Sequence, residues 1–367
     1  MENEYLDSYE RAKRADRERR SHARQMKRRR QKRLKMIKGA ITAAVAVVVA
    51  VCCILYTTRG EGGGQADGIN SQQMAQDAMQ ALVQISEPEQ KFKYPSVSEN
   101  YKEIVSEEVK SPYVALLDVE NSQVIAGRGY NEKIYPASMT KIMTAIVALE
   151  AFSDLDHEIT LSENIFYALD GQDATQAGFQ PGESVRVRDL VYGIMLPSGE
   201  ECCLALADEV SGSEEAFVEK MNKKAKSIGM KDTHFMDCTG LHDPEHYSTA
   251  YDIALLLKYA LHNDTFREVA ESHFHSTPAT NVHPDGITYY STMFKNMSDT
   301  SVPGVEILGG KTGYTSEAGH CLASFAQIYG REYILVTAGA AADATGVPHI
   351  LDAKTIYNRL GEAVAKK

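Results

Sequence analysis

The chain is organised around one stretch, which reads Tyr135-Pro136-Ala137-Ser138-Met139-Thr140-Lys141-Ile142-Met143-Thr144-Ala145. It opens a run of apolar residues at helical spacing that continues to Leu149. Proline is tolerated just ahead of such a run, because the first N–H groups of a helix have no intrahelical partner. The pattern predicts a helix with Ser138 in its first turn and Lys141 one turn later on the same face. A hydroxyl and an amine then lie within hydrogen-bonding reach of each other.

This pairing suits nucleophilic catalysis. A serine hydroxyl is a weak nucleophile unless a neighbouring group takes its proton. A lysine takes that proton when its pKa is lowered, and burial shifts a lysine by up to roughly 3–5 units. Ser138 and Lys141 are therefore a candidate nucleophile and base. Both residue types are common, so the pair alone is equally compatible with an ordinary helix start.

A second motif, Leu196-Pro197-Ser198-Gly199-Glu200-Glu201, stands between two helical patterns, and its serine follows Ser138 by 60 residues. One interpretation makes Ser198 a polar group of the same site. The other makes it the cap of the following helix, with Glu201 as its capping-box partner. The two interpretations are compatible.

A third motif, Lys311-Thr312-Gly313-Tyr314, follows the predicted strand 305–308 and lies 113 residues after Ser198. Glycine lets a backbone approach a ligand closely. A lysine and a hydroxyl beside it can hold a carboxylate. A phosphate-binding loop is excluded, because Val305 stands where the first glycine of that loop is required and a strand follows instead of a helix.

The order of predicted elements implies an α+β domain over residues 111–367. Its N-terminal and C-terminal strands are expected to share one antiparallel sheet flanked by helices. The expected elements are a hairpin at 113–119 and 123–126, a strand at 158–161, helices at 187–196, 200–210, 213–228 and 249–262, strands at 305–308, 321–328 and 333–338, and a helix at 349–364.

The N-terminal third has a different composition. Residues 1–38 hold 15 Lys/Arg and 6 Asp/Glu, whereas the rest of the chain holds 24 and 44. Residues 39–56 are 18 consecutive uncharged residues, enough to cross a bilayer core of about 30 Å. We expect a basic cytoplasmic tail, a single transmembrane signal anchor at 39–56, an extracytoplasmic spacer at 57–110 and an extracytoplasmic folded domain. The acidic main body argues against nucleic acid as a partner.

Ser-x-x-Lys, Ser-Gly-x and Lys-Thr-Gly in this order resemble the motifs of the serine penicillin-binding proteins and β-lactamases. The chain is most similar to the low-molecular-weight D-alanyl-D-alanine carboxypeptidases. Further shared features are Gly178 with Pro181-Gly182-Glu183, Thr239-Gly240-Leu241, and Ala318-Gly319. The likeness covers about 111–361 and implies a β-lactamase/transpeptidase-like fold.

The resemblance also implies roles. Ser138 would form an acyl-enzyme on peptidoglycan stem peptides that end in D-Ala-D-Ala, Lys141 would accept its proton, and Ser198 would pass a proton to the leaving D-alanine. Lys311 and Thr312, followed by Gly313, would hold the terminal carboxylate. The backbone N–H groups of Ser138 and Tyr314 would form the oxyanion hole. β-Lactams would be covalent inhibitors, and neither a metal nor a cofactor is expected.

Glu200 departs from the family pattern, because the second motif is expected to end in Asn. An ionised carboxylate only accepts hydrogen bonds, whereas an amide both donates and accepts. Glu200 would either pair with Lys141 or Lys311 and raise the pKa of that lysine, or carry a proton, or point away from the site.

Three alternatives remain open. A β-lactamase would need a deacylating carboxylate, for which Glu163 and Glu183 lie in the right region of the sequence. A zinc hydrolase would use the row His234, Cys238, His242 and His246, although Gly240 and Pro244 interrupt any helix there. A penicillin-binding protein with impaired hydrolysis would act as a membrane-anchored sensor or scaffold. Whether thiols pair is also open for Cys202, Cys203, Cys238 and Cys321.

Overall fold

The computed structural model describes residues 92–172, 174–297 and 302–366. All of these residues belong to one compact unit that begins at Phe92. The predicted basic tail 1–38 and the predicted anchor 39–56 lie outside the described residues. Within the described residues, no helix combines the length and the apolar character that crossing a membrane requires.

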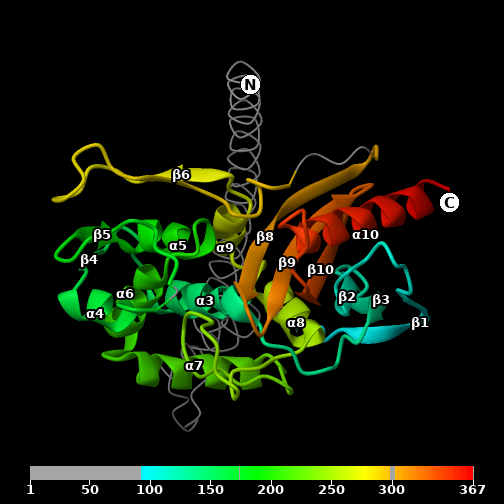
Figure 1. The fold of residues 1–367 in the computed structure, drawn as a ribbon, viewed down its shortest axis with the longest axis horizontal. Helices are drawn as coiled ribbons and strands as arrows, with labels where there is room; N and C mark the ends of the chain where they lie inside the picture. Colours follow the sequence, from blue (N-terminus) through cyan, green and yellow to red (C-terminus); the bar gives the residue numbers. More distant parts are fainter. Residues whose placement is uncertain (1–91, 173, 298–301, 367) are drawn as a thin grey trace, which may run out of the picture. The chain divides into compact units, whose positions relative to one another are not determined.

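A six-stranded sheet forms the centre of this unit, with the strand order β1-β3-β2-β10-β9-β8 (Figure 1). Its strands are β1 (Ser96–Glu103), β2 (Tyr113–Asp118), β3 (Gln123–Arg128), β8 (Val305–Thr315), β9 (Gly319–Ile328) and β10 (Arg331–Ala340). The two ends of the folded chain meet where β2 pairs antiparallel with β10. The predicted α+β class, with N-terminal and C-terminal strands in one sheet, is confirmed.

Strand β1 departs from the predicted layout in two ways. It pairs parallel with β3, so the sheet is mixed rather than antiparallel throughout. It also lies within 57–110, the segment predicted to be a spacer, so the folded unit begins before the predicted boundary at 111. Six of its eight residues are exposed at the edge of the sheet. No apolar alternation therefore marks this strand in the sequence.

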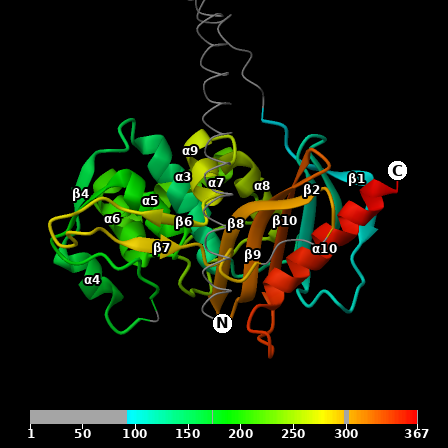
Figure 2. The ribbon, with the colours of Figure 1, turned by 90° about the horizontal axis from the view of Figure 1, so that it is seen from above.

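The sheet is covered on both faces. Helix α10 (Pro348–Ala365) packs on one face and α8 (Ala250–Ala260) on the other, as Figure 2 shows. Successive side chains of a strand point to opposite faces. Leu116 of β2 accordingly belongs to the core under α10, and Leu117 belongs to the larger core on the helical side.

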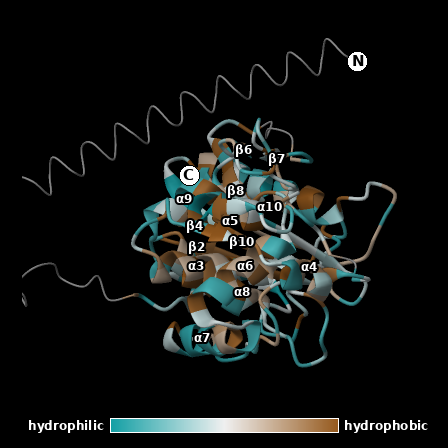
Figure 3. Ribbon diagram, turned by 90° about the vertical axis from the view of Figure 1, so that its left-hand side faces the viewer, coloured by the Kyte–Doolittle hydropathy of each residue, from teal (hydrophilic) through white to brown (hydrophobic). Residues whose placement is uncertain are grey.

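Helix α3 (Lys141–Ala151) is the centre of the helical layer, and every residue from 141 to 149 is buried. It packs against α5 (Val187–Met195), α6 (Glu200–Ser211), α7 (Glu214–Ser227) and α8. Figure 3 shows hydrophobic ribbon gathered toward the middle of this unit and hydrophilic ribbon toward its outside. Because α3 is buried along these residues, Lys141 in its first turn lies in a water-poor setting.

Short elements complete the fold. They are the 3-10 turn η1 (Ala137–Thr140), the helices α4 (Glu163–Leu169) and α9 (Asp264–Ala270), and the two-stranded sheets β4 (Glu158–Thr160) with β5 (Ser184–Arg186) and β6 (Phe274–Ser276) with β7 (Thr288–Tyr290). Of these, β4 was expected from the sequence, and η1 falls where the first turn of the Ser138 helix was predicted. Segments of three to seven residues carry too few positions for a periodic pattern to appear.

Two local differences affect the candidate site. Ser138 lies in η1, one turn before α3, rather than inside the helix. Lys311-Thr312-Gly313 lies within β8 rather than after a strand, because the ladder with β9 continues through Gly309 and Gly310. A side chain at Gly309 would place its Cβ only 2.2 Å from the carbonyl oxygen of Ala270, so glycine allows α9 to pack directly on β8.

Candidate active site

Ser138 and Lys141 meet at the junction of η1 and α3. The Lys141 ammonium donates to Ser138 Oγ over 3.1 Å and to the carbonyl oxygen of Thr239 over 2.8 Å. Lys141 is fully buried, whereas Ser138 is partly exposed. Ala137 adopts a φ of +47°, a left-handed conformation that is costly for a residue with a side chain. The predicted nucleophile thus reaches solvent, while the amine beside it does not.

Ser198 and Lys311 form the second half of the site. The Lys311 ammonium donates to Ser198 Oγ over 2.9 Å and to the Thr312 carbonyl oxygen over 2.9 Å. Ser198 lies between α5 and α6 with a left-handed φ of +73°. Burial lowers the pKa of Lys311 well below its usual value, and the nearby Lys141 charge lowers it further. Two buried amines and two hydroxyls from distant parts of the chain therefore share one site.

Glu200, the first residue of α6, points into this site. Its Oε1 lies 3.5 Å from Lys141 Nζ and accepts from the Thr175 N–H over 3.4 Å. Its Oε2 is buried and has no hydrogen-bond partner within the described part of the chain. Burial raises the pKa of the Glu200 carboxyl, and the Lys141 charge opposes this only in part. Glu200 therefore contacts Lys141 and does not point away from the site.

Glu201 is directed elsewhere. Its Oε1 accepts from the N–H groups of Ala177 and Gly178, over 2.6 and 3.0 Å. The N-cap of α6 is Gly199, and no side-chain capping bond is present at this helix start. Ser198 and Glu201 therefore do not form the capping box that the sequence also allowed. Glu201 instead ties the loop before β5 to α6.

The third motif approaches the nucleophile through its glycine. A Cβ added to Gly313 would lie 3.0 Å from the backbone nitrogen of Ser138, so β8 and η1 are in direct backbone contact. Gly240, with a φ of +89°, packs on the same turn, where a Cβ would meet the Ala137 carbonyl oxygen at 2.0 Å. Tyr314 follows Gly313 on β8 and is half exposed, with its ring against His320.

Thr312 is held by a residue that sequence reasoning missed. Its Oγ1 lies 2.7 Å from Oγ1 of Thr292. Thr292 in turn donates its N–H to the carbonyl oxygen of Leu196, just before Ser198. Thr292 therefore links the second and third motifs. It lies in a short irregular segment with no neighbouring motif, so the sequence gives no signal for it.

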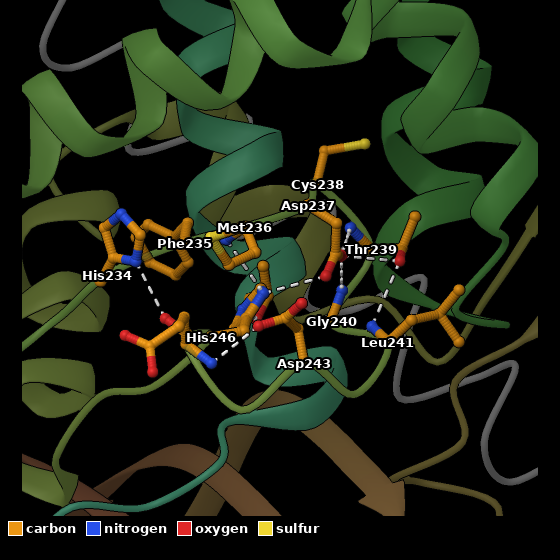
Figure 4. A network of polar contacts seen from close by, with 12 residues as sticks. His234, Phe235, Met236, Asp237, Cys238, Thr239, Gly240, Leu241, Asp243 and His246 are labelled. Carbon is orange, nitrogen blue, oxygen red and sulfur yellow. Dashed lines mark hydrogen bonds and ion pairs between the residues drawn. The ribbon is translucent and has the colours of Figure 1, made fainter.

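A polar network around Asp237 and His246 includes Thr239, the residue whose carbonyl oxygen accepts from Lys141 (Figure 4). The Asp237 carboxylate accepts from Thr239 Oγ1 and from the N–H groups of Thr239 and Gly240, and its other oxygen lies 2.9 Å from His246 Nδ1. His246 Nε2 lies 2.9 Å from Thr140 Oγ1. Burial alone would raise the pKa of Asp237, but these hydrogen bonds, that of His246 first, hold it below its usual value. The network fixes the Thr239 carbonyl that accepts from Lys141.

The residues of the zinc alternative have other partners. His234 Nδ1 lies 2.9 Å from the Glu245 carbonyl oxygen, and His246 belongs to the network just described. No group of three or more His, Cys, Asp or Glu residues suited to hold a metal occurs in the described ranges. Cys238 is buried and unpaired, as are Cys202, Cys203 and Cys321.

The carboxylates of the β-lactamase alternative also lie in other settings. Glu183 is fully buried and accepts from the Gln180 N–H and Thr280 Oγ1, with His283 2.9 Å away. Glu163 is exposed in the first turn of α4. The carboxylate nearest to Lys141 is that of Glu200.

Known proteins resemble this chain in sequence and in fold. Residues 99–342 match the model of the peptidase S11 family, described as D-alanyl-D-alanine carboxypeptidase. The chain is 34% identical over 241 residues to D-alanyl-D-alanine carboxypeptidase DacF of Bacillus subtilis, covering 65% of this chain and 59% of the relative. It is 33% identical over 242 residues to DacC of Escherichia coli K12, covering 62% and 56%. The chain spans somewhat more than half the length of these curated relatives.

Two solved structures have a fold similar to that of this chain. The Streptomyces K15 DD-transpeptidase superposes with a TM-score of 0.60 at 26% identity, covering 73% of this chain and 99% of that one. A D-alanyl-D-alanine carboxypeptidase from Mycobacterium tuberculosis H37Rv gives a TM-score of 0.62 at 25% identity, covering 74% and 96%. With two thirds of its length matched by the family model and the three motifs gathered around Ser138, this chain belongs to the D-alanyl-D-alanine carboxypeptidase family of serine peptidases, S11.

Proposed function

We propose that this protein is a serine-type D-alanyl-D-alanine carboxypeptidase, which removes the terminal D-alanine from peptidoglycan stem peptides ending in D-Ala-D-Ala. The observation that carries the proposal is the convergence of a partly exposed Ser138, 3.1 Å from the buried Lys141, with the Ser198–Lys311 pair in one site. Membership of the S11 family supports the substrate class.

In the acylation step, Ser138 Oγ attacks the carbonyl carbon of the penultimate D-alanine. Its proton passes to Lys141 Nζ, which has to be neutral at that moment. The tetrahedral intermediate then expels the amine of the terminal D-alanine. The proton that Lys141 accepted passes to that amine through the Ser198 hydroxyl, which leaves Lys141 neutral, an ester at Ser138 and free D-alanine.

Two features would stabilise the charges of this reaction. The N–H groups of Ser138 and Tyr314 would face the oxyanion, because Gly313 lets β8 lie directly against η1. Losing one such donor typically costs on the order of 10²–10³ in rate. Lys311 and Thr312 would hold the terminal carboxylate of the substrate through positive charge and a hydroxyl, with Thr292 positioning Thr312.

In the deacylation step, water attacks the ester carbon and gives a proton to Lys141. The bond between the acyl carbon and Ser138 Oγ then breaks, and Lys141 passes the proton to Ser138 Oγ, which restores the hydroxyl. Replacement of water by an amine would give transpeptidation instead. A β-lactam would acylate Ser138 in the same manner, and its opened ring keeps the amine leaving group tethered in the site. β-Lactams would therefore act as covalent inhibitors.

The location of the enzyme is part of the proposal. Residues 39–56 would cross the cytoplasmic membrane once, with the basic residues 1–38 on the cytoplasmic side and the catalytic domain outside, where peptidoglycan lies. Extraction of membranes from producing cells tests this, because an anchored protein stays in the pellet at high salt and alkaline pH. Release into the supernatant would contradict the anchor.

The activity is tested by D-alanine release from an acylated tripeptide that ends in L-Lys-D-Ala-D-Ala. We expect the wild type to release one D-alanine per peptide. Ser138→Ala should release none, whereas Ser227→Ala, which removes an exposed hydroxyl at the end of α7, should behave as the wild type. Equal release by wild type and Ser138→Ala would refute the proposal.

A further inference from the structure

Glu200 is a carboxylate that the reaction described above does not use. It is 4% exposed, and it stands at the position where the family motif has Asn. One carboxylate oxygen contacts the base Lys141 and the other has no hydrogen-bond partner among the described residues. A buried, half-satisfied carboxylate beside the catalytic amine is costly to maintain, which points to a role in the chemistry.

The charged groups around Glu200 differ in how closely they approach it. Lys141 reaches it from α3, Lys311 lies within electrostatic range on β8, and Asp237 lies within range on the loop before Gly240. On its own helix, Cys203 is a fully buried thiol and the Glu201 carboxylate faces the backbone of residues 177 and 178. Lys141 is therefore the only one of these groups in ion-pair contact with Glu200.

We propose that Glu200 takes the proton of the Lys141 ammonium in the resting site and so supplies the neutral amine that deprotonates Ser138. In this step an N–H bond of Lys141 breaks and an O–H bond forms on Glu200. The pair keeps one proton in total, and no exchange with solvent is needed. Glu200 is thus a positioning residue: it holds a proton and acts on the reaction through Lys141.

The geometry favours this transfer over a fixed ion pair. Burying two opposite charges costs more than their attraction returns unless the remaining lone pairs are satisfied. Here the Glu200 carboxylate receives only one long bond, from Thr175, besides Lys141. Moving the proton replaces two buried charges with two neutral groups. The raised pKa of the Glu200 carboxyl agrees with this direction.

The inference rests on the proposed function. It predicts the direction in which the pH dependence of acylation shifts when Glu200 is replaced. In the wild type, Lys141 becomes neutral once the pair has lost the first of its two protons, and that loss belongs to the pair as a whole. The acid limb of the pH–rate profile for acylation, where the rate falls as the pH drops, then lies in the pH range of a carboxyl group with a raised pKa. Without the carboxyl, Lys141 has to release its proton to solvent, and the acid limb moves to higher pH.

The experiment measures the second-order rate of acylation by a fluorescent penicillin between pH 5 and pH 10 for the full-length protein. We expect Glu200→Gln to shift the acid limb upward by at least about one pH unit, which is roughly a tenfold lower rate at pH 6, and to approach the wild-type rate at high pH. Glu201→Gln, the matched change at the neighbouring carboxyl, should leave the limb in place. Glu200→Asp retains a carboxyl and should keep the limb near that of the wild type.

A downward shift or an unchanged limb in Glu200→Gln would overturn the inference. A carboxylate that only pairs with Lys141 stabilises the charged ammonium, so its removal favours the neutral amine and moves the limb to lower pH. If Glu200→Gln does not fold, Glu200→Asn carries the same test, and an acid limb at or below that of the wild type is again contrary. A wild type that penicillin does not label would refute the proposed function itself, and the inference with it.

Discussion

At the scale of single residues, the site depends on backbone conformations that side chains disfavour. Ser198 has a φ of +73°, and its hydroxyl accepts from Lys311. Ser198→Ala and Ser198→Gly should both lose the hydroxyl and most D-alanine release. Glycine relieves the left-handed strain, so we expect the free energy of unfolding of Ser198→Gly to be about 0.5–1 kcal/mol higher than that of Ser198→Ala. Urea unfolding measures this, and equal stability of the two variants would contradict it.

The residues of the site were predictable where they form motifs. Ser138, Lys141, Ser198 and the Lys311 motif were each named from the sequence, and the structure brings them together. Thr239 was quoted only as part of the family likeness. Its contact with Lys141 is made by a backbone carbonyl 98 residues away, and every residue has such a group, so side-chain chemistry gives no signal for it.

At the scale of elements, the approach of β8 to η1 is the decisive contact. Gly313→Ala would place a Cβ 3.0 Å from the Ser138 nitrogen and force the strand away from the nucleophile. We expect the acylation rate by penicillin to fall by about 10²–10³, as for loss of one oxyanion donor. Thermal unfolding monitored by circular dichroism is the control. A wild-type rate in a folded variant would contradict the account.

Helix α10 adds a pH dependence of stability. His349 in its first turn is buried beside His320, and its Nδ1 has no hydrogen-bond partner within the described ranges. Burial, and then the His320 charge, lower the pKa of His349 from 6.5 to about 4. The unfolded chain binds this proton below pH 6.5 and the folded chain only near pH 4. Stability is therefore complete above pH 6.5 and falls as the pH drops through that window.

The measurement compares urea unfolding at pH 7 and pH 4.5 for wild type and His349→Gln. The wild type should lose roughly 2–3 kcal/mol more than the variant over this interval, because a pKa difference of one unit is worth about 1.4 kcal/mol. An equal loss in both proteins would show that His349 does not titrate as the structure implies.

Predictability of the elements followed their length and burial. The long helices and β9, β10 and α10 were found within a few residues because each carries a periodic apolar pattern. β1 was missed because it is a polar edge strand, and its place beside β3 depends on contacts that only the folded chain provides. The continuation of β8 was missed because its glycines are typical of a break between elements of secondary structure.

At the scale of the whole molecule, the residues just before β2 belong to the folded unit. Lys258 is 4% exposed, and its ammonium donates to the Lys93 carbonyl oxygen over 2.5 Å. Tyr251 donates its hydroxyl to the Pro95 carbonyl oxygen over 2.7 Å. β1 adds its ladder with β3. The contacts of Lys258 and Tyr251 cross 165 and 156 residues of sequence and join the start of the unit to α8, whereas the β1–β3 ladder joins segments that are close in sequence.

A chain of residues 92–367 should therefore fold and react with penicillin like the full-length protein. A chain of residues 111–367 leaves Lys258 without one buried acceptor and loses β1. We expect it to be less stable by about 1–3 kcal/mol, because the buried Lys258 ammonium keeps only Ser122 Oγ as an acceptor and the ladder of β1 with β3 is lost. Urea unfolding of the two chains is the measurement. Equal midpoints and slopes would show that residues 92–110 are dispensable.

The most direct test of Ser138 as the nucleophile is mass spectrometry of the protein after reaction with benzylpenicillin. We expect one added penicilloyl group, located on the peptide that contains Ser138, and no addition to Ser138→Ala. We also expect Lys141→Ala, with the proposed base removed, to react far more slowly at neutral pH. A wild type without the adduct, or an adduct that persists in Ser138→Ala, would contradict the claim that Ser138 is the nucleophile.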